Sequence, residues 1–250
     1  MIIGSPANIF AAVFVGGMAI GYGLSVVIPK SAQVPQSLTV DQMFKNAMRD
    51  AMVAEEWKIC SNLTAIVDTN LDLMWQGEGD NKTVLVVVWT KYPSSYPFGG
   101  VVNTTWGETW VTVAPELKTF FKDSSVPEEN LKLRAEQLLG LPRENGNTHF
   151  VELWVRPQDL FRPSPDCEIN DTVAQLTFPE NADLVYKKWF NDNIIYSYFA
   201  KQYPWTRLGY TYDWGNTHGS FGLTEYVLRQ NATVIVESVK PAAEYLHSND

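Results

Sequence analysis

Residues 83–90 read TVLVVVWT, a run of β-branched and aromatic side chains without a charged position. A continuously apolar run of this length is typical of a β-strand covered on both faces, whereas a strand with one solvated face alternates apolar and polar residues. The polar turn GEGDN (77–81) precedes the run, and the proline- and glycine-rich segment 92–100 (YPSSYPFGG) follows it. We therefore expect a sheet with packed layers on both sides.

The segments around this strand combine further strands and helices in an irregular order. Apolar residues at helical spacing, with capping residues, predict helices at 41–57, 115–123, 127–139 and 181–202. Runs rich in β-branched and aromatic residues predict strands at 63–75 (a pair around 68–70), 106–113, 148–155, 174–178, 223–228 and 233–239, the last two joined as a hairpin by 229–232. Because strands and helices do not alternate regularly, we expect an α+β domain with a mainly antiparallel sheet and several flanking helices.

Residues 9–28, IFAAVFVGGMAIGYGLSVVI, form an apolar stretch without a charged side chain. A helix of about twenty residues extends about 30 Å, the thickness of a bilayer's hydrocarbon core. A signal peptide cleaved near Ala32 fits less well, because no Lys or Arg precedes the stretch and Lys30 occupies a position where cleavage sites have a small residue. A buried helix of a soluble protein is rarely apolar all round. We expect a transmembrane anchor at 1–28, a linker at 29–40 and one globular domain at 41–250.

The side of the membrane on which the domain lies is indicated by conflicting features. Lys30, which follows the apolar stretch, favours a cytoplasmic domain. Five Asn-x-Thr glycosylation sequences favour an exported one; their acceptors are Asn62, Asn81, Asn103, Asn170 and Asn231. Cys60 and Cys167 also fit an exported chain, in which a pair invites one disulfide worth about 4 kcal/mol; two unrelated thiols are the alternative. We expect a single-pass membrane glycoprotein with an extracytoplasmic domain.

The composition limits the possible partners. Hydrophobic residues make up 45% of the chain and aromatic residues 13%, which predicts a packed core rather than a disordered chain. The net charge is −9 and no Lys/Arg cluster offsets it, so nucleic acid is not expected as a partner. Gly17 and Gly21 form a Gly-x-x-x-Gly pair, a candidate contact for a partner helix in the membrane, although glycine is common in membrane helices generally.

Residues 203–215, YPWTRLGYTYDWG, form a dense aromatic segment. Aromatic faces with a few charged groups suit a sugar or peptide ligand, because rings stack on it while polar groups orient it. The candidate ligand-binding residues are Trp205, Arg207, Tyr210, Tyr212, Asp213 and Trp214. The alternative is a well-packed structural loop in which Arg207 and Asp213 pair with each other.

No catalytic, cofactor or metal motif is evident. Asp213, His218 and Ser220 contain the groups of a catalytic trio, but sequence neighbours rarely have the required geometry, and no Gly-x-Ser-x-Gly motif occurs. Residues 166–171 (DCEIND) space oxygen ligands as a calcium loop does, yet they lack the glycine and the distal glutamate of an EF-hand, so turn formation explains them better. We expect no metal site and no cofactor.

These features favour binding or scaffolding over catalysis. The preferred hypothesis is a membrane-anchored extracytoplasmic module that binds an envelope glycan or a protein partner. Two alternatives stay open. One is a tethered hydrolase that uses acidic residues near segment 203–215, and the other is an accessory subunit of an integral membrane complex.

Overall fold

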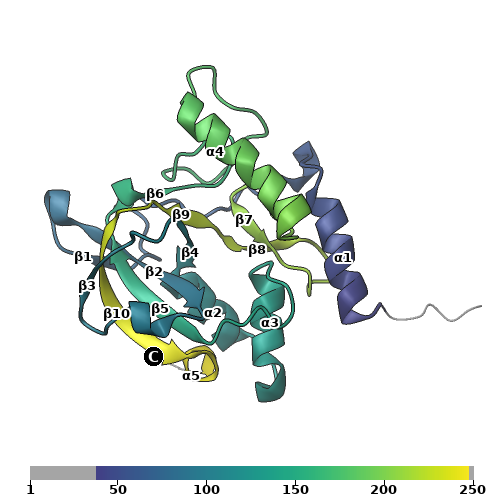
Figure 1. Ribbon diagram of the computed structural model, residues 1–250, viewed down its shortest axis with the longest axis horizontal. Helices are drawn as coiled ribbons and strands as arrows, with labels where there is room; N and C mark the ends of the chain where they lie inside the picture. The colour runs from purple at the N-terminus through teal and green to yellow at the C-terminus, as the bar shows by residue number, and fades with distance from the viewer. Residues whose placement is uncertain (1–37, 248–250) are drawn as a thin grey trace, which may run out of the picture. The chain divides into compact units, whose positions relative to one another are not determined.

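The computed structural model describes residues 38–247 (Figure 1). The expected anchor and the Gly17–Gly21 pair lie outside these residues. Within the described part of the chain, no helix combines the length and the apolar character needed to cross a membrane. The domain has a mainly antiparallel sheet with several helices, as the sequence predicts.

The elements alternate irregularly along the chain. The strands are β1 (Trp75–Gln76), β2 (Thr83–Thr90), β3 (Val101–Asn103), β4 (Thr109–Val113), β5 (His149–Val155), β6 (Leu160–Phe161), β7 (Tyr210–Tyr212), β8 (Phe221–Thr224), β9 (Tyr226–Leu228) and β10 (Thr233–Pro241). The helices are α1 (Val40–Ala51), α2 (Ala114–Asp123), α3 (Leu131–Leu138), α4 (Leu184–Ile195) and α5 (Ala242–His247). A π-helical turn, η6 (Tyr196–Ala200), continues α4, and single 3-10 turns occur in several connections.

Strand β2 lies in the middle of the sheet and is buried on both faces, which confirms the prediction from TVLVVVWT. Val84, Val86 and Val88 point to one face, where they join apolar residues of the neighbouring strands. The opposite face carries Leu85, Val87 and Trp89, and this face packs against α2, α3 and α5. These three helices lie on the same side of the sheet (Figure 1). Each fully buried apolar side chain of this size contributes about 1.5–3 kcal/mol.

The pairings of the main sheet close into a ring. All strand pairs in the described chain are antiparallel, and their order is β3-β10-β5-β2-β4-β9-β6, with β1 added to β2. Strand β3 continues into β4, and β9 continues into β10. The two connections are joined at Thr104, whose N–H donates to the Ala232 carbonyl at 2.9 Å while its own carbonyl accepts from Asn231 N–H at 3.0 Å. The ring encloses the valine-rich core around Val86.

Several predicted elements differ from those observed. Segments 223–228 and 233–239 are not a hairpin, because β9 pairs with β4 and β6 while β10 pairs with β3 and β5. Segments 63–75 and 174–178 contain no strand beyond the start of β1. Instead, Leu63 N–H donates to the Thr172 carbonyl and Ile66 N–H to the Ile169 carbonyl, so these irregular segments satisfy each other's backbone groups.

The predicted helices are observed near their expected positions, and several of them are shorter than expected. Helix α1 starts at Val40, inside the expected linker, because Thr39 and Gln42 form a capping box, and it ends at Ala51 rather than near Trp57. Helix α3 is followed by Gly140 at φ +65°, as the predicted glycine stop requires. The expected helix 181–202 is observed as α4, capped by Asp183, together with η6.

Candidate functional site

A cavity of about 330 Å³ lies between the helix-covered side of the sheet and the segment that follows α4. Aromatic side chains dominate its lining, and we call it the aromatic cavity. They are Trp89, Trp110, Phe150, Tyr196, Tyr203, Trp205, Tyr210 and Tyr212. Polar side chains from separate elements complete the lining, namely Thr112, Asn147, Asn193, Ser197, Lys201, Thr211 and Glu225. Apolar walls with a few polar groups are the usual composition of a small-molecule site.

The structure divides the candidate ligand-binding residues into two groups. Trp205, Tyr210 and Tyr212 line the aromatic cavity. Arg207, Asp213 and Trp214 do not line it, so their expected role in that site is not supported by the geometry. All three have structural partners elsewhere, which are described next.

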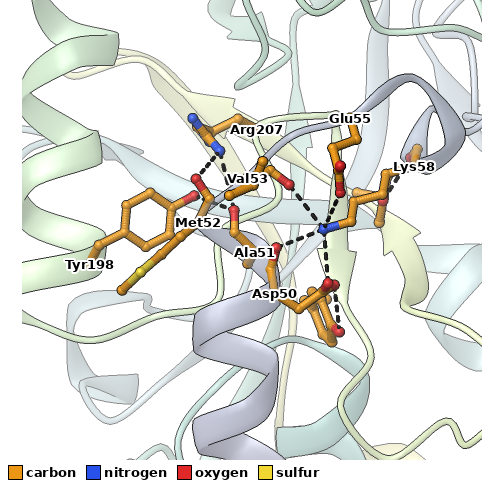
Figure 2. A network of polar contacts seen from close by, with 10 residues as sticks. Asp50, Ala51, Met52, Val53, Glu55, Lys58, Tyr198 and Arg207 are labelled. Atoms are coloured by element: carbon orange, nitrogen blue, oxygen red, sulfur yellow. Dashed lines mark hydrogen bonds and ion pairs between the residues drawn. The ribbon is translucent and has the colours of Figure 1, made fainter.

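Arg207 joins the aromatic segment to the end of α1. Its Nη2 donates to the carbonyls of Ala51 at 3.2 Å and Met52 at 2.9 Å, and its guanidinium lies 5.4 Å from the centre of the Tyr198 ring (Figure 2). A cation at the C-terminal end of a helix is favourable, because the last carbonyls there lack helical partners. Arg207 therefore fixes the position of the aromatic segment relative to α1.

Lys58 holds the same helix end from the other side. Figure 2 shows its buried Nζ between the carbonyls of Asp50 and Val53, at 2.7 and 2.9 Å, and the Asp50 carboxylate at 2.9 Å. The second carboxylate oxygen of Asp50 accepts a hydrogen bond from the Tyr212 hydroxyl at 3.0 Å. The network thus extends to Tyr212 and fixes one aromatic ring of the cavity lining.

Asp213 pairs with Arg134 of α3 and not with Arg207. The two guanidinium nitrogens of Arg134 contact the two carboxylate oxygens of Asp213 at 2.8 and 2.6 Å, and Asp213 is only 2% exposed. Next to it, the indole N–H of Trp214 donates to the Leu141 carbonyl at 3.0 Å. Both residues fasten the end of the aromatic segment to α3 and the turn after it.

Glu225, which the sequence reasoning missed, is the only acidic residue among the described residues that line the aromatic cavity. The residue as a whole is partly exposed, but its Oε2 is buried and has no hydrogen-bond partner among the described residues. Burial raises the pKa of this carboxyl from 4.5 to about 8. The indole N–H groups of Trp89 and Trp205, in the same lining, are also buried without a partner. The sequence feature that could have identified Glu225 is its position as the single acid within the apolar run LTEYVL (223–228).

Glu116 of α2 is a second buried carboxyl near this wall, and it is well bonded. It accepts hydrogen bonds from the N–H and hydroxyl of Thr224, at 3.0 and 3.3 Å, and from the hydroxyl of Thr112 at 3.4 Å. Burial raises its pKa to about 7, and these hydrogen bonds partly oppose the rise. Glu116 therefore fastens α2 to β4 and β8, whereas its neighbour Glu225 has no such partners.

Acidic residues of the loop 166–171 come together more closely than the sequence suggested. One carboxylate oxygen each of Asp166, Glu168 and Asp171 lies within 4.8 Å of the others, and this is the group in the described chain that could hold a metal ion. The buried guanidinium of Arg162 already pairs with Asp171. The loop is thus explained by an internal ion pair, and the absence of a metal site stays a prediction.

The predicted disulfide is not present in the structure, where Cys60 and Cys167 are free thiols. Their segments run antiparallel, with Leu63 bonded to Thr172 and Ile66 to Ile169. Both thiols are half-buried and unbridged.

We expect two reactive thiols per chain when the protein is purified and unfolded without reductant. Thiol titration with a chromogenic disulfide reagent measures this number, and intact mass before and after alkylation checks it. The unfolded chain treated with reductant serves as the control for complete reaction. A chain with no titratable thiol and a mass lower by two hydrogens would contradict the arrangement described above.

All five predicted glycosylation acceptors are exposed. The side chains of Asn62, Asn81, Asn103, Asn170 and Asn231 lie on the surface of the domain. Exposure is necessary for modification of a folded surface, and it leaves glycosylation itself a prediction.

Comparison of the chain with protein-family models, with curated proteins and with solved structures gave no match. The function is therefore argued from the aromatic cavity and its lining.

Proposed function

We propose that the domain is a binding module and that the aromatic cavity is its ligand site. The observation that carries this proposal is an apolar cavity whose aromatic lining contains one acidic side chain, Glu225, and the buried Oε2 of this carboxyl has no hydrogen-bond partner among the described residues. Buried polar groups are normally hydrogen-bonded, so a ligand that donates a hydrogen bond would supply what this carboxyl lacks.

The volume of the cavity limits the size of the ligand that it can hold. About 330 Å³ lies at the small end of the range of about 300–1,000 Å³ that is typical of ligand pockets. A small organic molecule, or one terminal unit of an envelope glycan, fits this volume. An extended protein segment does not, so within the binding hypothesis a compact ligand is favoured over a protein partner at this site.

The proposal keeps the membrane location expected from the sequence. Residues 9–28 would anchor the module, and the domain would face the outside, where its exposed Asn-x-Thr sites can be modified. The two free thiols lend no support to this location. An accessory-subunit role through Gly17 and Gly21 remains a proposal that rests on the sequence alone.

A hydrolase is the second candidate, and Glu225 is the observation that favours it. A carboxyl whose pKa is raised to about 8 in an apolar cavity can act as a general acid near neutral pH. Hydrolysis of a glycoside, however, uses two carboxyls that flank the reacting bond. Within residues 38–247, Glu225 is the only acid in the lining, and Asp213 is bonded to Arg134. Binding therefore accounts for the site better than hydrolysis.

Replacing Tyr196 by alanine is expected to weaken ligand binding at least tenfold and to leave the fold intact. Tyr196 lines the cavity and is 54% exposed, so its removal takes away a ligand contact without opening the core. The measurement is a thermal-shift screen of monosaccharides and small aromatic compounds, followed by calorimetric titration of any hit against both proteins.

The matched control is Phe98→Ala, because Phe98 is 79% exposed and does not line the cavity. Trp205→Ala is a poor probe, since Trp205 is only 5% exposed and its loss would damage the core. A hit that binds Tyr196→Ala as tightly as the wild type would place its site elsewhere and count against the proposal.

A further inference from the structure

The charged groups around the aromatic cavity are distributed unequally. Lys201 and Glu225 are the charged residues among the described lining. Lys201 is exposed, and its Nζ lies 5.8 Å from the centre of the Tyr196 ring, at the outer part of the lining. The Glu225 carboxyl has neither a hydrogen-bond donor nor an ion-pair partner in the described chain. The cavity wall thus contains one acidic group that nothing in the domain neutralises.

An unpaired carboxylate beside apolar walls carries a large desolvation penalty. In the free protein the group avoids this penalty by keeping its proton. A ligand that brings a positive charge against the carboxyl replaces that proton with a permanent partner. A neutral ligand leaves the carboxyl protonated and gains at most an ordinary hydrogen bond.

We propose that the ligand of the aromatic cavity is a small organic cation whose ammonium group pairs with the Glu225 carboxylate. This inference rests on the proposed ligand-binding function and narrows its substrate class. The glycan hypothesis is restricted accordingly to sugars that carry an amine. A neutral sugar becomes the competing outcome.

The aromatic lining is suited to a cation for an independent reason. Trp110 and Trp205 lie with their ring centres 5.7 Å apart and their planes at 88°, so they form a corner in the wall. The electron-rich faces of tryptophan and tyrosine attract ammonium groups, and tryptophan does so most strongly. The net charge of −9 also raises the local concentration of small cations near the domain.

Between pH 5 and 9, the other titratable groups near the cavity do not produce the pH dependence of cation binding that we expect from Glu225. Burial raises the pKa of Tyr210 to about 12, raises that of Tyr212 still further, and raises that of Tyr198, behind the wall, to about 12. Glu116 titrates near pH 7, but its hydrogen bonds tie it to Thr112 and Thr224.

The test compares three cations with neutral molecules of similar shape. The pairs are choline with 3,3-dimethyl-1-butanol, benzylamine with benzyl alcohol, and cyclohexylamine with cyclohexanol. Calorimetric titration at pH 8.5 is expected to show at least one cation binding at least tenfold tighter than its neutral counterpart. For choline, whose charge is permanent, the affinity should fall roughly fiftyfold or more between pH 8.5 and pH 6, because the proton then competes for Glu225.

Glu225→Gln is the decisive variant, because glutamine keeps the shape of the side chain and removes the charge. In this variant the preference for each cation over its neutral counterpart should fall to the smaller preference that the aromatic faces alone supply, and choline binding should lose its pH dependence. Glu129→Gln, at an exposed acid that does not line the cavity, should behave as the wild type. Lys201→Gln should not weaken cation binding.

The outcomes separate the two proposals. If the neutral molecules bind as tightly as the cations, the cavity is a ligand site and the cation inference is wrong. If the cation preference is as strong in Glu225→Gln as in the wild type, the inference is also wrong. If none of the six compounds binds, both the inference and the proposed function fail.

Discussion

The free energy of unfolding is expected to fall as the pH rises from about 5 to about 9. Glu225 and Glu116 have pKa values of about 8 and about 7 in the folded protein, against an ordinary value of 4.5. At a pH between the ordinary pKa and the folded-state pKa, the carboxyl in the folded protein keeps a proton that the unfolded chain has already released. Stability that depends on such protons is complete below pH 4.5 and is lost as the pH passes the folded-state pKa.

The effect of Glu225 is large compared with the stability of an ordinary domain. A rise from 4.5 to about 8 corresponds to about 3–5 kcal/mol at 1.36 kcal/mol for each pKa unit. Most domains are stable by only about 5–15 kcal/mol. Burial also raises the pKa values of Asp166 and Glu136, so these two groups change stability in the same direction.

Urea unfolding at pH 5, 7 and 9 measures the effect, with Glu225→Gln as the informative variant. Glutamine does not ionise, so the variant should lose less stability than the wild type between pH 7 and pH 9, and it should be the more stable protein at pH 9. Glu129→Gln should follow the wild type at every pH. Equal pH dependence in the wild type and Glu225→Gln would show that Glu225 does not titrate as described.

The fold class was predictable because its main signal is local. The run TVLVVVWT marks a strand buried on both faces, and both faces of β2 are buried in the structure. The ring of strands was not predictable, because it depends on pairings between distant segments such as β3 with β10. The turn residues 229–232 suggested a hairpin, since local turn chemistry cannot show that β9 and β10 each have better partners elsewhere.

The site was predictable in part for the same reason. Segment 203–215 supplies four rings of the cavity lining, and its composition alone drew attention to them. The roles of Arg207 and Asp213 depend on partners in α1 and α3, far away in the sequence, so sequence neighbourhood wrongly suggested that they pair. Glu225 was missed because an acid in an apolar run has chemical meaning only once the facing wall is known.

Replacing Arg162 by methionine is expected to destabilise the domain by about 3 kcal/mol. Arg162 is fully buried and pairs with the carboxylate of Asp171, and its Nη2 donates to the Asp171 carbonyl at 2.5 Å. Removing one partner of a buried ion pair costs about 3–5 kcal/mol, because the remaining charge loses its compensation. The Asp171 side chain is 41% exposed, so water partly solvates the carboxylate that remains and the cost lies toward the lower end of this range. Since Arg162 Nε has no hydrogen-bond partner, the variant also removes an unsatisfied donor, which places the cost at the lower end of this range.

The position of Arg162 explains why this cost is not avoided by local rearrangement. The Tyr186 hydroxyl of α4 donates to the Arg162 carbonyl at 3.0 Å, and Gly209, at φ +74°, gives room for the arginine side chain. A Cβ at Gly209 would lie 2.6 Å from Arg162 Cδ. The arginine thus packs between α4 and the aromatic segment, and a shorter side chain leaves a space that neither can fill without moving.

Chemical unfolding of Arg162→Met beside Arg156→Met tests this reasoning. Arg156 makes a partly exposed pair with Asp159 at 2.9 Å, so its loss should cost no more than about 1 kcal/mol. Adding Asp171→Asn to Arg162→Met should recover part of the stability, because the uncompensated carboxylate is then gone. If Arg162→Met costs no more than Arg156→Met, the buried pair is not what holds α4 and the aromatic segment together. The cavity wall would then depend on apolar packing alone, and the double variant would show no recovery.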